Sequence, residues 1–192
     1  MKQLAIVTVL VIGCGDSGSD DFARRASEVE GIYQVQAYTR NETACAPGGT
    51  SQLGSETFAF AVRQSFLGQT LLSVMSCASV ADCHDKAARV QGGQGVALDF
   101  SFGVSEVSGD ALVGQGASTG FGIDGVCTGG ELTATTLTLD GDALAIEQQI
   151  TVADDYPVDA DGFCTTDAAR AAADGNTCTQ LELLSATFVE PL

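Results

Sequence analysis

The chain of 192 residues has no Trp, a single His, three Pro, and only eight Lys and Arg residues against 25 Asp and Glu. The formal net charge of −17 repels nucleic acid and anionic membrane surfaces, so neither is expected as a partner. No Cys-x-x-Cys pair occurs and His84 is the only imidazole, which leaves zinc-type metal sites without their usual ligands. These absences remove several common classes of function before any motif is considered.

The same scarcity argues against catalysis. A Ser-His-Asp or Cys-His arrangement would have to use His84, whose neighbour Cys83 is predicted to be oxidised. A Ser-Lys dyad would need Lys86, and nothing marks a partner Ser. Carboxylates are plentiful, so a hydrolase with a carboxylate pair stays as a third alternative, although no spacing singles out a pair. We therefore predict that the chain is not an enzyme.

Long apolar runs are also missing, and the run 4–12 is too short to span a bilayer. It follows Lys2 and ends in Val11-Ile12-Gly13-Cys14, which resembles the lipobox of bacterial lipoproteins. The resemblance implies cleavage after residue 13 and a membrane anchor on the acylated Cys14. An Asp directly after Cys14 would resemble an inner-membrane retention signal, but it comes one place later, at Asp16. An outer-membrane location is therefore favoured.

This interpretation divides the chain into three parts. Residues 1–13 are the signal peptide, and residues 14–30 are the lipidated Cys and a flexible tether, with a short helical turn around 22–29. Residues 31–192 form one disulfide-braced β-barrel domain, which we expect to be monomeric.

Seven Cys are present, and lipidation of Cys14 leaves an even six: Cys45, Cys77, Cys83, Cys127, Cys164 and Cys178. In an exported chain an even set predicts three disulfides, for which 15 pairings are possible. Cys164–Cys178 is the first choice because the two bracket one helical segment. Cys77–Cys83 is a local option, and Cys45–Cys127 would remain.

From residue 32 onward, short alternating segments separated by Gly-rich turns predict an all-β fold. Eight strands are expected at about 32–39, 57–64, 69–77, 96–105, 110–118, 131–139, 143–153 and 179–189. Short helices are expected at about 79–90 and 166–173, and Asp-Gly at 140–141 predicts a tight hairpin.

Long and short links between these strands alternate, and all six remaining Cys lie in or beside the long links. This pattern predicts an antiparallel up-and-down meander or barrel, with both helices in long loops at one end that the disulfides brace. The anchor would then lie at the opposite end. The architecture is similar to that of a lipocalin, without a specific lipocalin motif, and the interior candidates are Phe58, Phe60, Leu98, Phe100, Phe102 and Ile146.

No cofactor is predicted, apart from a weak calcium candidate. Asp159-x-Asp161-Gly162 resembles part of an EF-hand loop, but Pro157 and Ala168 occupy the first and last ligand positions. A site other than an EF-hand could use Asp155, Asp159 and Asp161.

The overall residue pattern loosely resembles that of the uncharacterised envelope lipoproteins of myxobacteria and their relatives, without a defining motif. We expect a binding or interaction module that acts through the braced loops and meets an unknown protein. A lipocalin-like carrier of a small apolar ligand is the alternative. An apolar cavity inside the barrel would favour the carrier, and a filled barrel would favour the interaction module.

Overall fold

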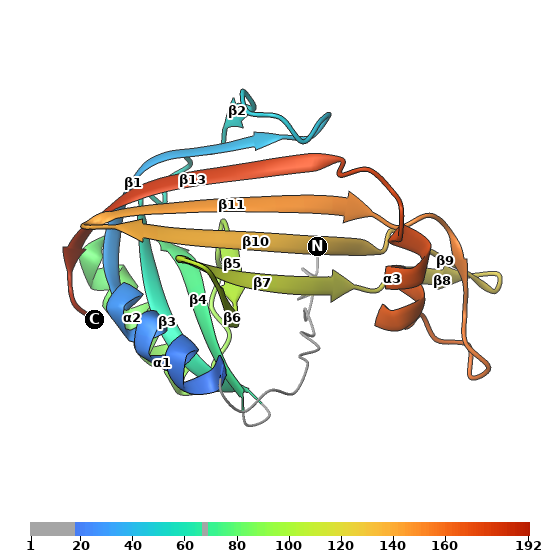
Figure 1. The fold of residues 1–192 in the computed structure, drawn as a ribbon, viewed down its shortest axis with the longest axis horizontal. Coiled ribbons are helices and arrows are strands. Elements are labelled where there is room, and N and C mark those ends of the chain that lie inside the picture. The colour runs from blue at the N-terminus through green and yellow to red at the C-terminus, as the bar shows by residue number, and fades with distance from the viewer. Residues whose placement is uncertain (1–17, 67–68) are drawn as a thin grey trace.

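The computed structural model describes residues 18–66 and 69–192, which form a nearly closed antiparallel barrel (Figure 1). Eight stretches of chain build its wall, and the fourth is bent into two short strands. These are β1 (Gly31–Asn41), β3 (Phe58–Phe66), β4 (Gln69–Cys77), β5 (Ser101–Val104) with β6 (Glu106–Ser108), β7 (Ala111–Ser118), β10 (Glu131–Asp140), β11 (Ala143–Val152) and β13 (Gln180–Glu190). A two-residue strand, β2 (Thr50–Ser51), also pairs with β1. The predicted all-β class is confirmed, and seven of the eight expected strands are found close to their predicted positions. The strand expected at 96–105 begins only at Ser101, and a separate short strand, β6, follows it.

The strands follow one another around the barrel in sequence order, and β13 returns to pair with β1. Every pairing is antiparallel, so the chain runs up and down. The long connections follow β1, β4, β7 and β11, and the short turns lie at the other ends of these strands. Long and short links therefore alternate as the sequence predicts. The two helices predicted in long links do not share one end, however: His84 of the helix predicted at 79–90 lies 3.0 Å from Glu190, at the end of β13, while the helix predicted at 166–173 lies at the far end of the long strands (Figure 1).

The bent fourth stretch closes the barrel. Its first half, β5, pairs with β4, and its second half, β6, pairs with β7. Between the two halves the backbone N–H of Ser105 donates to the Val113 carbonyl at 2.9 Å. Gly114 makes this approach possible, because a Cβ there would overlap the Gly103 carbonyl and lie 2.8 Å from Val104 Cα.

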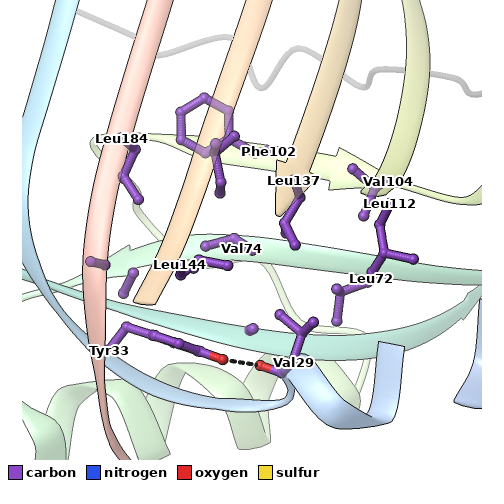
Figure 2. Packing of buried hydrophobic residues seen from close by; sticks show 14 of the residues in the cluster. Val29, Tyr33, Leu72, Val74, Phe102, Val104, Leu112, Leu137, Leu144 and Leu184 are labelled. Atoms are coloured by element: carbon purple, nitrogen blue, oxygen red, sulfur yellow. Dashed lines mark hydrogen bonds between the residues drawn. The ribbon is translucent and has the colours of Figure 1, made fainter. Parts of the chain in front are cut away.

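Apolar side chains from all parts of the wall fill the barrel (Figure 2). Phe100, Phe102 and Ile146 belong to this core, as predicted. The rings of Phe100 and Phe102 lie 5.5 Å apart between centroids, and Tyr38 packs 4.9 Å from Phe100. Since β5 packs close to both β7 and β10, the barrel is narrow at this level.

The helix α1 (Gly18–Val29) is longer than the short helical turn predicted around 22–29, and it packs against this core. Phe22, Ala26 and Val29 recur at helical spacing, and all three are buried. Tyr33 donates a 2.7 Å hydrogen bond to the Val29 carbonyl, which fixes the junction of α1 with β1 (Figure 2). The prediction of a flexible tether is therefore wrong for residues 18–30. The polar composition of residues 18–30 favours a tether, but its apolar residues Phe22, Ala26 and Val29 lie within the predicted helical turn and are buried.

The helix α2 (Val80–Gln91) packs on the outer face of the wall, against Ile32, Phe60 and Met75. Phe58, Phe60 and Leu98 belong to this outer cluster, so their assignment to the barrel interior is wrong. Alternation shows which residues share a face, but it does not show which face is inside. Here the small residues Ala59 and Ala61 point inward, and Phe58 and Phe60, which alternate with them, point toward α2.

A buried ion pair holds α2 in place. Lys86, whose side chain is almost fully buried, pairs with the Glu56 carboxylate and donates to the Ser76 carbonyl at 3.2 Å. Burial alone would raise the pKa of Glu56, but the hydrogen bonds from Lys86 and from the backbone around Asp99 outweigh it and lower that pKa.

Three disulfides join Cys45–Cys178, Cys77–Cys83 and Cys127–Cys164. The local Cys77–Cys83 pair agrees with the prediction, and the other two predicted pairings are wrong. Cys45 follows β1 and Cys178 precedes β13, and these two strands are neighbours in the barrel. Cys164 instead meets Cys127, because the chain before α3 (Thr166–Ala173) folds back onto the connection between β7 and β10.

The predicted signal peptide and the predicted lipidation site Cys14 lie outside the described residues. Among the residues that the structure describes, no helix has the length and apolar character needed to cross a membrane.

Candidate interaction surface at the disulfide-braced end

A small second sheet stands beside the barrel, at the end where α3 lies (Figure 1). Its strands are β8 (Phe121–Ile123) and β9 (Val126–Thr128), both from the connection between β7 and β10, and β12 (Tyr156–Pro157), from the connection between β11 and β13. The Cys127–Cys164 disulfide joins the same two connections. Two segments distant in sequence thus form one braced unit.

The hairpin of β8 and β9 turns at Asp124-Gly125. Both residues have positive φ angles, 52° and 84°, and Ile123 pairs with Val126 on either side of them. Asp-Gly with two left-handed residues is typical of the type I′ turn, whose twist suits a two-residue hairpin. The turn therefore fixes which side chains share a face.

One face of this hairpin is buried. Cys127 points inward with Tyr156, and both pack with Ala169 and Ala173 of α3. The Tyr156 hydroxyl accepts a 3.0 Å hydrogen bond from the backbone N–H of Gly120, where the chain enters β8. The inner face is therefore anchored by a disulfide, a helix and a tyrosine.

The opposite face of the hairpin is apolar and exposed. Phe121 is 69% accessible, Ile123 is 63% and Val126 is 39%. Their registers place all three on the same side of the two strands, opposite Gly122 and Cys127. We call these three residues the hairpin face. A rigid display of large apolar side chains to water is a common mark of an interaction site.

A second exposed aromatic residue, Phe163, lies one residue before the disulfide-bonded Cys164 and is 68% accessible. Asp159 shapes its loop: Oδ1 accepts hydrogen bonds from the backbone N–H groups of Phe163 at 2.8 Å and of Asp161 at 3.0 Å. This carboxylate therefore caps a turn, which explains the Asp-x-Asp-Gly pattern without a metal. Asp155, Asp159 and Asp161 form no ligand cluster in the described part of the chain.

The surroundings of the hairpin face are strongly acidic. The two stretches that build the unit, 119–130 and 153–179, carry seven Asp residues and one basic residue, Arg170. All seven Asp residues are exposed, including Asp124 in the turn. A partner that covers this face must therefore also meet a negative field.

Inside the barrel, polar side chains form a network between β1 and β13. Tyr38 donates to Glu182 Oε2 at 2.7 Å, Gln180 donates to Oε1 at 2.7 Å, and Arg40 Nε lies 2.9 Å from Oε1. The Arg40 contact is an ion pair by distance, although its N–H does not point at the oxygen. Burial, and then the bond to Glu182, raise the pKa of Tyr38. The carboxylate is satisfied by its own neighbours, so we assign the network a structural role.

A depression of about 440 Å³ lies on the outer face of the wall, across β1, β13, β11 and β10. Small and hydroxylated side chains line it, among them Thr39, Thr136, Thr138 and Ser185. It opens to solvent on the outside of the barrel. It therefore adds no support to a carrier that would hold an apolar ligand in the interior.

Cys127 and Cys164 lie in long connections, as predicted, but the hairpin between β7 and β10 was not predicted. The signal was present, because Asp124-Gly125 stands between the short alternating runs at 121–123 and 126–128, as Asp140-Gly141 does in the hairpin that was predicted. Comparison with known protein families, with curated proteins and with solved structures finds no match for this chain.

Proposed function

We propose that this chain is a lipid-anchored envelope protein that binds a partner protein through the hairpin face. The observation that carries the proposal is the exposure of Phe121, Ile123 and Val126 on one side of a hairpin whose other side is fixed. A folded chain gains nothing in stability from holding large apolar side chains in water. A partner that covers them gains their burial, about 25 cal/mol per Å² of apolar surface.

Rigidity supports the same proposal. The hairpin is held by the Cys127–Cys164 disulfide, by the Tyr156 hydroxyl and by a turn of defined type. A surface that is already in its binding conformation loses little conformational freedom on association, which favours affinity. The braced loops that were expected to act as the binding end contain this surface.

The envelope location rests on two observations. Three disulfides are typical of proteins that fold in an oxidising compartment outside the cytoplasm. The resemblance of Val11-Ile12-Gly13-Cys14 to a lipobox supports an anchor at the N-terminal end. Arg25 of α1 lies 3.7 Å from Asp110, in the turn before β7, and the hairpin follows the other end of β7, so the hairpin face would point away from the membrane.

Site-specific photo-crosslinking in the bacterium that makes the protein tests the binding surface. A benzophenone amino acid is placed at Phe121 and, as a matched control, at Val189, an exposed apolar residue on β13. We expect a discrete crosslinked species from position 121 and none from position 189. Equal crosslinking from both positions, or none from 121, would refute the proposal. In the same cells, Cys14→Ser should release the protein from the membrane fraction.

A further inference from the structure

The partner of the hairpin face can be described by its chemistry. A second copy of this chain would bring a net charge of −17 to a surface that already carries seven Asp and one Arg. Juxtaposed like charges oppose association, so a self-complementary dimer through this face is disfavoured. A partner that fits this surface has apolar side chains that cover Phe121 and Ile123. It also has Lys or Arg close by, because the surroundings are negatively charged.

The backbone adds a second requirement, because β8 is the last strand of its sheet. The order is β12-β9-β8, so within the described residues β8 pairs on one side only. In a two-residue hairpin the residues next to the turn, Ile123 and Val126, bond to each other, so the next pair, Gly122 and Cys127, directs its N–H and C=O groups outward. Those of Cys127 face Tyr156 of β12. Those of Gly122 face the free edge.

The two faces at this edge differ in character. Phe121 and Ile123 make one face apolar. On the other face, a Cβ at Gly122 would lie 3.4 Å from Val158 and 3.9 Å from the Gly162 carbonyl, which belong to the loop of the exposed carboxylates Asp159 and Asp161. A strand that continued the sheet would therefore present alternate residues to an apolar face and to an acidic loop.

We propose that the edge of β8 accepts an extended segment of a partner, in which apolar and basic residues alternate. The inference rests on the proposed function and specifies how binding occurs. The segment adds as a further strand, its backbone bonds to Gly122, its apolar residues cover Phe121 and Ile123, and its basic residues meet the acidic loop. Main-chain bonds then supply affinity, and the two faces supply specificity.

A fluorescence titration with synthetic peptides tests this mode, and the absence of Trp from the chain removes the background. The probe is a capped peptide of about eight residues that alternates Lys and Val and carries one Trp. A second peptide has Glu in place of Lys. Two further peptides are N-methylated at every second residue, one at the odd positions and the other at the even positions. Because alternate N–H groups of an extended peptide point to opposite edges, each of these peptides lacks the hydrogen-bond donors of one edge. The protein variants are Phe121→Ser with Ile123→Ser, and Val189→Ser as a matched control.

We expect the wild type and Val189→Ser to bind the Lys peptide. The Glu peptide, the double variant and one of the two N-methylated peptides should each weaken binding by at least about tenfold. Equal binding of the Lys and Glu peptides would overturn the charge argument. Equal binding of both N-methylated peptides by the wild type would overturn strand addition, whatever the stability of the double variant.

The two proposals fail in different ways. If the Lys peptide does not bind while the benzophenone at Phe121 still captures a partner, then only the strand-addition inference is wrong. If neither experiment gives a signal at Phe121, then the proposed function itself is wrong.

Discussion

The phenol of Tyr38 donates a 2.7 Å hydrogen bond to Glu182 across the seam between β1 and β13, inside the barrel. Tyr38→Phe keeps the ring packed against Phe100 but leaves the buried carboxylate with one partner fewer. We expect a loss of about 2 kcal/mol in the free energy of unfolding, the usual cost for a hydrogen bond to a buried charged group. Urea denaturation measures it. Combined with Glu182→Gln, the loss should be clearly less than additive; strict additivity would show that the two residues are not coupled.

Alkaline pH should destabilise the fold through its buried tyrosines. Burial, aided by the nearby Asp142, raises the pKa of Tyr33 to about 12. The unfolded chain loses this proton near pH 10 while the folded chain still holds it, so this contribution to stability is intact below about pH 10 and is lost as the pH rises through about 12. Tyr38 acts in the same direction. Urea midpoints from pH 8 to 11 should fall, and Tyr33→Phe should flatten the fall; a flat wild-type profile contradicts the assignment.

The closure of the barrel should depend on Gly114. Gly114→Ala places a Cβ against the backbone of Gly103 and Val104, and we expect a loss of about 2 kcal/mol or more because the backbone must shift. Gly95→Ala is the control, since a Cβ there meets nothing within 4 Å and the φ angle is not in the left-handed region. Thermal unfolding of the two variants compares them directly. Equal melting temperatures would mean that β5 and β7 do not meet as described.

Substitutions in α1 test whether residues 18–29 form a packed helix or a flexible tether. Phe22→Ala removes a side chain that is 2% accessible, so we expect a loss of about 3 kcal/mol in unfolding free energy. Arg24→Ala, on the exposed side of the same helix, should leave the stability close to that of the wild type, because its ion pairs lie in solvent. If both variants match the wild type in urea, residues 18–29 contribute nothing to the core.

The three disulfides should differ in their contributions. In the chain-entropy description the stabilisation grows with the length of the closed loop, here 133 residues for Cys45–Cys178 and 6 for Cys77–Cys83. Replacing both Cys of a pair by Ala should cost about 5 kcal/mol for the first pair and about 2 kcal/mol for the second. For Cys127–Cys164 we expect a local effect as well, with faster amide exchange in β8 and β9. Chemical denaturation and hydrogen exchange test this ranking. A larger loss of stability from removing Cys77–Cys83 than from removing Cys45–Cys178 would contradict it.

Much of the wall could be predicted from the sequence, because period-2 alternation and turn chemistry are local properties. The strand 69–77 and the helix 166–173 agree with β4 and α3 residue for residue. Inside and outside could not be told apart at Phe58 and Phe60, since both faces of β3 are covered. The pairing of Cys45 with Cys178 could not be predicted without knowing that the first and last strands are neighbours. That adjacency exists only in the closed barrel.

The candidate site was harder to predict than the wall. Phe121, Ile123 and Val126 occupy strands of three residues, too short for alternation to be read with confidence from sequence. Phe163 is displayed by a turn that Asp159 caps, and the same Asp-rich pattern suggested calcium instead. The exposure of an apolar residue depends on what packs around it, and sequence pattern does not contain that information.

The pairing of β1 with β13 also sets the order of assembly. Every other strand pairing in the barrel wall joins stretches that are neighbours along the chain, so these pairings can form one after another. The first strand must wait for the last, since Ile32 pairs with Glu190. Contacts of such wide sequence separation are slow to form. The disulfide between Cys45 and Cys178 then links the two strands covalently, so that they stay paired once they have met.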